Sequence, residues 1–127
     1  MKSALCVAVV SMLFGGQLAH AACSHDAVFL TLGEQIRGYS ARANGATEPC
    51  QVLQGPLTTL MTAGAMVIDK KDSFHVAQFL SNSTVDIFPR KAEGNQAPAR
   101  SFNFPMTNDL PGIAVDSHLN DFVMSVR

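Results

Sequence analysis

Two aspartates occupy matching positions in two similar stretches of the chain. Asp69 follows the apolar residues 65–68, and Asp116 follows the apolar residues 113–115. Recurring carboxylates of this kind are the ligands that a hard divalent cation such as calcium takes in proteins. An aspartate at a turn also hydrogen-bonds the backbone that follows it, and that role needs no ligand. We expect the turn role, which leaves Asp69 and Asp116 as weak metal candidates and implies no cofactor.

The histidines do not form an obvious catalytic or metal-binding set. His75 is expected within a strand and His118 within a turn, and their positions in the two similar stretches differ by several residues. Cys50 and His75 could together form a nucleophile pair, but no catalytic signature surrounds either residue. The sequence therefore predicts no catalytic residue.

Residues 1–21 have the three-part pattern of a secretory signal peptide. Lys2 precedes an apolar stretch at residues 4–14, and Ala19-His20-Ala21 provides a cleavage site with small residues at both ends. The apolar stretch is too short to cross a bilayer as a stable helix. We therefore expect a periplasmic or secreted protein that consists of residues 22–127 and has no membrane span.

Cys23 and Cys50 are the two cysteines that remain after such a cleavage. An exported chain can form disulfides, and two cysteines allow a single intramolecular pairing. The alternatives are two free thiols, or lipidation of Cys23 in a lipoprotein, which His20 three residues earlier disfavours. We predict the Cys23–Cys50 disulfide, which would close a loop of about 27 residues and add on the order of 3 kcal/mol.

The charge of the chain is nearly balanced, with nine Lys and Arg residues against ten Asp and Glu residues. The basic pairs Lys70-Lys71 and Arg90-Lys91 lie in predicted turns, where solvated charge explains them. No basic stripe follows a strand or a helix face, so nucleic acid is not an expected partner.

The mature chain is predicted to consist of short strands. Residues 35–39 alternate polar and apolar side chains, as a half-buried strand does, and residues 65–68 form the continuous apolar run of a strand buried on both faces. The turn signals Asn44-Gly45 and Gly94 separate such segments. The expected strands cover residues 28–32, 35–39, 51–53, 65–68, 74–77, 84–88, 99–102, 113–115 and 122–126.

These strands belong to a repeat. The pairs that lie 49 residues apart are Tyr39 and Phe88, Gly45 and Gly94, and Pro49 and Pro98. Self-similarity at a fixed period indicates one supersecondary unit that is copied and stacked. The repeat predicts a partial unit at 28–55, a complete four-stranded unit at 64–104 and a partial unit at 111–127.

Two segments of the repeat resemble sequences of one known protein family. Leu110-Pro111-Gly112-Ile113-Ala114-Val115-Asp116 is similar to the inner-strand signature of NHL-type and gluconolactonase-like six-bladed β-propellers. Val85-Asp86-Ile87-Phe88, followed by residues 93–101, is similar to the inter-strand stretch of bacterial secreted repeat proteins of that superfamily. The resemblance implies an all-β fold, a partial β-propeller of about two four-stranded blades with nine short antiparallel strands.

The same resemblance bears on metal chemistry. Lactonase-type propellers hold a divalent cation at the ring centre through carboxylates and amides. The matching positions here are Leu32, Gln78 and Ser125, and none of them is a carboxylate. This pattern argues against a metal-dependent reaction.

The number of blades raises a question of closure. Propellers close with about four to eight blades, and an open set exposes strand edges and one face of each terminal blade. The chain could be a truncated piece of a longer propeller, one member of a homo-oligomer that completes a ring, or a small irregular sandwich. We expect an exported non-catalytic repeat module that binds a protein or carbohydrate partner. The alternative function is a remnant or subunit of a lactonase-like metal-dependent hydrolase.

Overall fold

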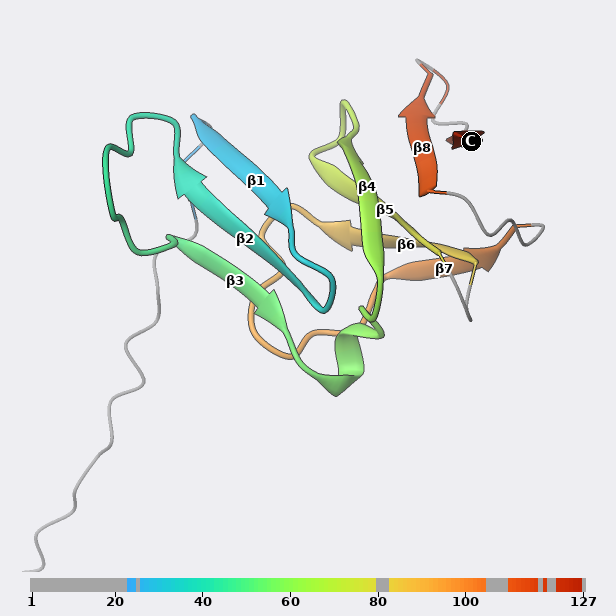
Figure 1. Cartoon of the computed structure of the whole chain (residues 1–127), viewed down its shortest axis with the longest axis horizontal. Coiled ribbons are helices and arrows are strands. Elements are labelled where there is room, and N and C mark those ends of the chain that lie inside the picture. The colour runs from blue at the N-terminus through green and yellow to red at the C-terminus, as the bar shows by residue number, and fades with distance from the viewer. Residues whose placement is uncertain are drawn as a thin grey trace, which may run out of the picture.

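The computed structural model describes residues 23–24, 26–79, 83–104, 110–116, 118 and 121–126. The predicted signal peptide, residues 1–21, lies outside these residues. Within them the chain forms nine antiparallel strands and a single short 3₁₀ turn, which confirms the all-β prediction (Figure 1). A search of the same residues finds no helix with the length and apolar character that crossing a membrane requires.

The nine strands form three sheets in which neighbours in sequence pair with each other. The first sheet contains β1 (Ala27–Thr31), β2 (Gln35–Ser40) and β3 (Gln51–Gln54). The 3₁₀ turn η1 (Pro56–Thr58) leads to the second sheet, which contains β4 (Ala63–Ile68), β5 (Ser73–Gln78), β6 (Thr84–Pro89) and β7 (Arg100–Asn103). The third sheet contains β8 (Leu110–Val115) and β9 (Asp121–Val126).

The repeat in the sequence is also a repeat of strand register. Ile36 of β2 pairs with Leu53 of β3, and the residues 49 positions later, Val85 and Phe102, pair in β6 and β7. The same shift carries each of the other three residue pairs of β2 and β3 onto a pair of β6 and β7. The first sheet therefore corresponds to the second sheet without its first strand.

Glycine supports the repeated loop geometry. Gly45 and Gly94, which are equivalent in the repeat, have φ angles of 66° and 64°. This left-handed conformation is easy for glycine and costly for residues that carry a Cβ. Two matching loops thus follow the two matching strands, as the turn signals in the sequence predicted.

The core lies between the first and second sheets. Because side chains alternate across a strand, each sheet presents every second residue to the other. Phe29 of β1 packs on Phe74 of β5, with ring centroids 4.7 Å apart. The buried cluster around this contact comprises Ile36, Leu53, Leu60, Ala63, Phe74, Val76, Phe88 and Ala92. In Figure 1 the two sheets stand face to face, and β8 lies beside β4 at the other side of the second sheet.

A loop of the second sheet extends the edge of the first. Gly94 forms a parallel bridge with Leu53 of β3, and its N–H donates to the carbonyl of Val52 at 2.8 Å. Gly94 in turn accepts a hydrogen bond from the N–H of Gln54 at 2.9 Å. The loop that belongs to one sheet is therefore hydrogen-bonded as part of its neighbour.

Candidate functional site

Asp69 caps the turn between β4 and β5. Its Oδ1 accepts hydrogen bonds from the N–H groups of Lys71 at 2.7 Å and Ser73 at 3.0 Å. Asp116 repeats the first of these bonds, since its Oδ1 accepts from the N–H of His118 at 2.7 Å. This is the turn role that we expected for both aspartates.

The second carboxylate oxygen of Asp69 contacts a buried histidine. Oδ2 lies 2.9 Å from Nε2 of His75, and the two side chains are only 4% and 3% exposed. Burial alone would raise the pKa of the Asp69 carboxyl, but the hydrogen bonds from His75, Ser73 and Lys71 outweigh it, and the pKa falls below its ordinary value of 3.8. His75 is therefore a packed strand residue with a charged neighbour, and the described residues contain no group of three or more metal-ligating side chains.

A shallow pocket opens beside this pair, on the face of the second sheet that points away from the first. It has a volume of about 210 Å³ and is lined by Asp69, Lys71, Ser73, His75, Ile87 and Arg100. The sequence did not predict that Arg100 and Ile87 would line a pocket beside Asp69. Ile87 lies in β6, next to β5, and Arg100 pairs with Ile87 from β7, one strand further away. No motif in the sequence links either residue to Asp69.

Gln78, one of the positions that the propeller resemblance matched to a metal ligand, has a structural role instead. Its Nε2 donates to the carboxylate of Asp86 and to the carbonyl of Thr59, the latter at 3.1 Å. Its Oε1 accepts from the N–H of Met61 at 2.7 Å. The Gln78 amide thus hydrogen-bonds the segment between η1 and β4 to β5 of the second sheet. Leu32 at the corresponding place in the first sheet is apolar, and Ser125 lies in β9.

Asp86 is the other end of this buried network. The residue is 1% exposed and accepts hydrogen bonds from the side chains of Gln78, Ser101 and Thr59. A buried charge needs several donors to remain stable. A charged residue in the middle of an apolar strand could have indicated this buried network. In the sequence analysis Asp86 served only as part of the repeat pattern.

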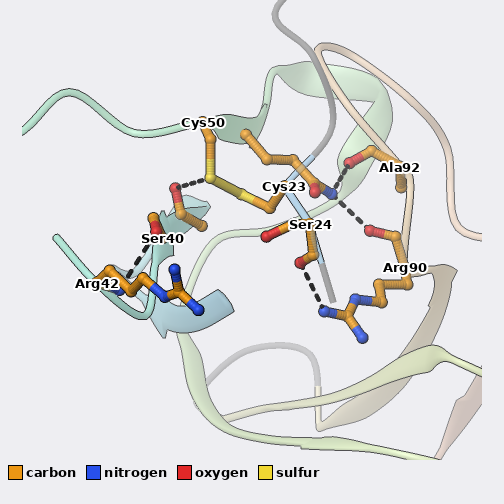
Figure 2. The surroundings of a disulfide bond; sticks show 9 residues. Cys23, Ser24, Ser40, Arg42, Cys50, Arg90 and Ala92 are labelled. Atoms are coloured by element: carbon orange, nitrogen blue, oxygen red, sulfur yellow. Dashed lines mark hydrogen bonds between the residues drawn. A yellow bond between two sulfur atoms is a disulfide. The ribbon is translucent and has the colours of Figure 1, made fainter. Parts of the chain in front are cut away.

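Cys23 and Cys50 form a disulfide, as predicted, with Cα atoms 5.2 Å apart (Figure 2). The bond joins the segment before β1 to the residue before β3. A Cys23 sulfur in this bond cannot carry the thioether of a lipoprotein, and Cys50 cannot act as a nucleophile. Arg90 lies beside the bridge, donating to the carbonyl of Ser24 at 3.1 Å and stacking over Phe29 at 5.5 Å.

The outer face of the first sheet carries the apolar side chains of Val28, Leu30, Tyr39 and Val52 around Arg37. Tyr39 and Val52 are half-buried. Val28 is 51% exposed and Leu30 is 46% exposed. The register places Val28 opposite Tyr39, just as Phe74 lies opposite Phe88 in the second sheet. Phe74, Val76 and Phe88, the counterparts of Val28, Leu30 and Tyr39, are 0% exposed because the first sheet covers them.

This outer face is the candidate binding surface. Within the part of the chain that the structure describes, an apolar sheet face that is buried in one unit stands open in the other. Contiguous apolar surface on a folded protein usually marks a contact with another molecule. The face is open because the first sheet is the first unit of the repeat, and no preceding unit among the described residues covers it. The sequence predicted this surface only in general terms, as the open face of a terminal blade.

Comparisons of the chain with protein-family models, with curated proteins and with solved structures found no match. The resemblance to NHL-type propellers therefore stays a prediction, and the functional argument depends on the geometry described above.

Proposed function

We propose that this chain is an exported, non-catalytic repeat module of β-propeller type that binds a protein partner through the outer face of its first sheet. The observation that supports this function is the exposure of Val28 and Leu30 at positions whose counterparts, Phe74 and Val76, are fully buried. Because each side chain is already about half covered, burying the remainder would contribute on the order of 1 kcal/mol each.

The composition of the outer face favours a protein over a carbohydrate. The face carries three aliphatic side chains and the single tyrosine of the chain, Tyr39, and the chain contains no tryptophan. Carbohydrates present many hydroxyl groups, which lose hydrogen bonds with water when they meet an aliphatic surface. Arg37 lies within the face, where it pairs with Leu30 and Val52, and its Nε donates to Oε1 of Gln35 at 3.0 Å. A partner with an apolar sheet or helix surface fits these properties.

Export is part of the proposal, and the disulfide supports it, since such bonds persist in oxidising compartments. The mass of the protein recovered from a periplasmic fraction tests it. We expect a chain that begins at residue 22 and is two hydrogen atoms lighter than the reduced form because Cys23 and Cys50 are bridged. A full-length chain in the cytosol would contradict export.

No geometric observation favours the hydrolase alternative. The Asp69 carboxylate is occupied by the turn and by His75, and the Gln78 amide is occupied by Asp86 and backbone groups. Oxygen ligands that are already hydrogen-bonded in this way would have to be released before they could hold a cation. We therefore propose a binding module and do not propose a second activity.

Photo-crosslinking in cells tests the binding function. A photoreactive amino acid replaces Leu30 on the outer face, and in a matched control it replaces Leu57, which is 58% exposed but lies in η1. We expect a discrete crosslinked protein from position 30 and none from position 57. Equal patterns from the two positions, or a crosslink to glycan alone, would contradict the proposal.

A further inference from the structure

The first sheet lacks the strand that β4 supplies to the second sheet. In the second sheet β4 pairs with β5, and the repeat counterpart of β5 is β1, because each pairs in the same register with the strand that follows it. Within the described residues, β1 pairs with β2 alone. The first sheet therefore has an open edge at the place where the second sheet has one more strand.

The hydrogen bonds at the two ends of β1 show which of its backbone groups face the open edge. The carbonyl of Asp26 accepts from the N–H of Ala41, and the N–H of Leu32 donates to the carbonyl of Gln35, each at 2.8 Å. The backbone groups of an antiparallel strand point alternately to its two sides, so the even-numbered residues bond on the β2 side and the odd-numbered ones face the open edge. The odd-numbered residues of β1 are Ala27, Phe29 and Thr31.

The corresponding backbone groups of the second sheet are hydrogen-bonded to β4. The carbonyl of Ser73 accepts from the N–H of Asp69 at 3.0 Å, and by the same alternation His75 bonds to its partner Val67. Phe29 takes the place of His75 in the register of the first sheet. A row of edge groups without a strand partner is a template for an added strand.

An apolar surface of β4 borders the open edge. Ala63, at the start of β4, bridges Gly33 just beyond the end of β1 (Figure 1). Ile68 pairs with Phe74, so its side chain and that of Met66, two residues earlier, take the face that the first sheet covers. Phe74 is 0% exposed, whereas Ile68 is 39% exposed and Met66 is half-buried. The first sheet thus leaves part of β4 uncovered where its own additional strand would lie.

We propose that the open edge of β1 binds an extended apolar segment of the partner protein as an added antiparallel strand. This inference rests on the proposed function, because it names how the partner binds. Half of the side chains of the added strand would join the outer face, and the other half would contact Ile68 and Met66, so the strand is apolar on both faces. Main-chain hydrogen bonds give the affinity in this mode of binding. The contact repeats the pairing of β4 with β5 inside the chain.

A peptide with the sequence of residues 63–72 is the probe, because it contains β4 and the charged residues that follow it. We expect saturable binding when the purified chain is titrated into the fluorescently labelled peptide. In the register of β4 on β5, the amide of Val67 faces the paired strand and the amide of Met66 points away. N-methylation at Val67 should weaken binding at least about tenfold, and N-methylation at Met66 should change it less than about twofold. Equal effects would overturn the proposal.

Variants of the chain locate the bound peptide. Ala27→Pro removes an N–H that faces the open edge and should weaken binding at least about tenfold, whereas Ala27→Gly keeps this N–H and should bind like the original chain. Ile68→Asp, which places a charge against the added strand, should also weaken binding. Leu57→Asp, at an exposed position in η1, is its control. Circular dichroism confirms that each variant is folded, and unchanged binding by both folded test variants would contradict the proposal.

Hydrogen exchange separates binding at the edge from binding at the outer face, and it uses the unaltered chain. The N–H of Phe29 faces the open edge, and the N–H of Leu30 bonds on the β2 side. Saturating peptide should slow exchange at Phe29 at least about tenfold and change exchange at Leu30 little. Peptide binding with no change at Phe29 would overturn the proposal.

The two proposals fail in different ways. A protein crosslinked at position 30, with no binding of the peptide, would overturn the added strand and leave the binding function intact. Peptide binding at the edge with no crosslink at position 30 would support the added strand and overturn binding through the outer face. Absence of both would overturn both proposals.

Discussion

Single residues show how the same turn can be stabilised to different extents in two repeats. Asp69 and Asp116 both accept the backbone N–H two residues later. Only Asp69 adds a buried histidine, since the side chain of His118 is 83% exposed and lies 3.7 Å from Asp116. The repeat in the sequence predicted the shared turn, whereas the extra contact depends on a neighbouring strand position.

Asp69→Asn should lower the free energy of unfolding by roughly 1 to 2 kcal/mol at neutral pH, because a charged acceptor is lost from a buried histidine. The folded-state pKa of Asp69 lies below 3.8, so its contribution is present above that value and disappears as the pH falls through the folded pKa. Urea unfolding at pH 7 and near pH 3 measures both effects. The matched control Asp116→Asn should cost less, and equal losses would contradict this explanation.

Gly38 is required by the space around the disulfide. A Cβ at this position would lie 2.6 Å from the ring of Phe29 and 2.7 Å from Sγ of Cys23. Gly38→Ala should therefore destabilise the chain by roughly 1 to 3 kcal/mol, the usual cost of overpacking. Thermal unfolding measures this loss. Adding Phe29→Leu should recover part of it, and fully additive losses would show that the two side chains do not compete for space.

At the scale of the elements, covalent and hydrogen-bonded links hold the sheets in place. The disulfide spans 27 residues and ties the start of β1 to the start of β3. Replacing both cysteines by serine should cost about 3 to 4 kcal/mol, the loop-closure entropy returned to the unfolded chain. Denaturant unfolding of the oxidised, reduced and double-serine forms checks this value. The reduced and double-serine forms should agree, and a stable reduced form would contradict the expectation.

Gln51 links the first sheet to the second through two carbonyl oxygens. Gln51→Glu keeps the shape but replaces the donor by an acceptor that faces those oxygens, so we expect a loss of roughly 2 kcal/mol or more at pH 7. Protonation of the new carboxyl restores a donor, and the loss should shrink in acid. Gln54→Glu on the exposed end of the same strand is the control. If both variants lowered the free energy of unfolding to a similar extent, the result would show that Gln51 does not link the two sheets.

At the scale of the whole molecule, the sequence predicted the strands well and the contacts between sheets poorly. The strands could be predicted because paired residues such as Tyr39 and Phe88 recur at a fixed period, and because glycine marks the loops. The inter-sheet role of Gln51 could not, since alternation along a strand tells which face a side chain takes and not which distant loop it meets. The Arg100 pocket and the Gln78–Asp86 network were missed for the same physical reason.

The bridge between Gly94 and Leu53 has a consequence for how the protein opens. Because the loop after β6 is hydrogen-bonded to β3, the first sheet cannot separate from the second without breaking backbone bonds of both. The amide protons of Gln54 and Gly94 should therefore exchange with deuterium only when the two sheets unfold together. Fast exchange at these two amides in a folded sample would show that each repeat opens alone.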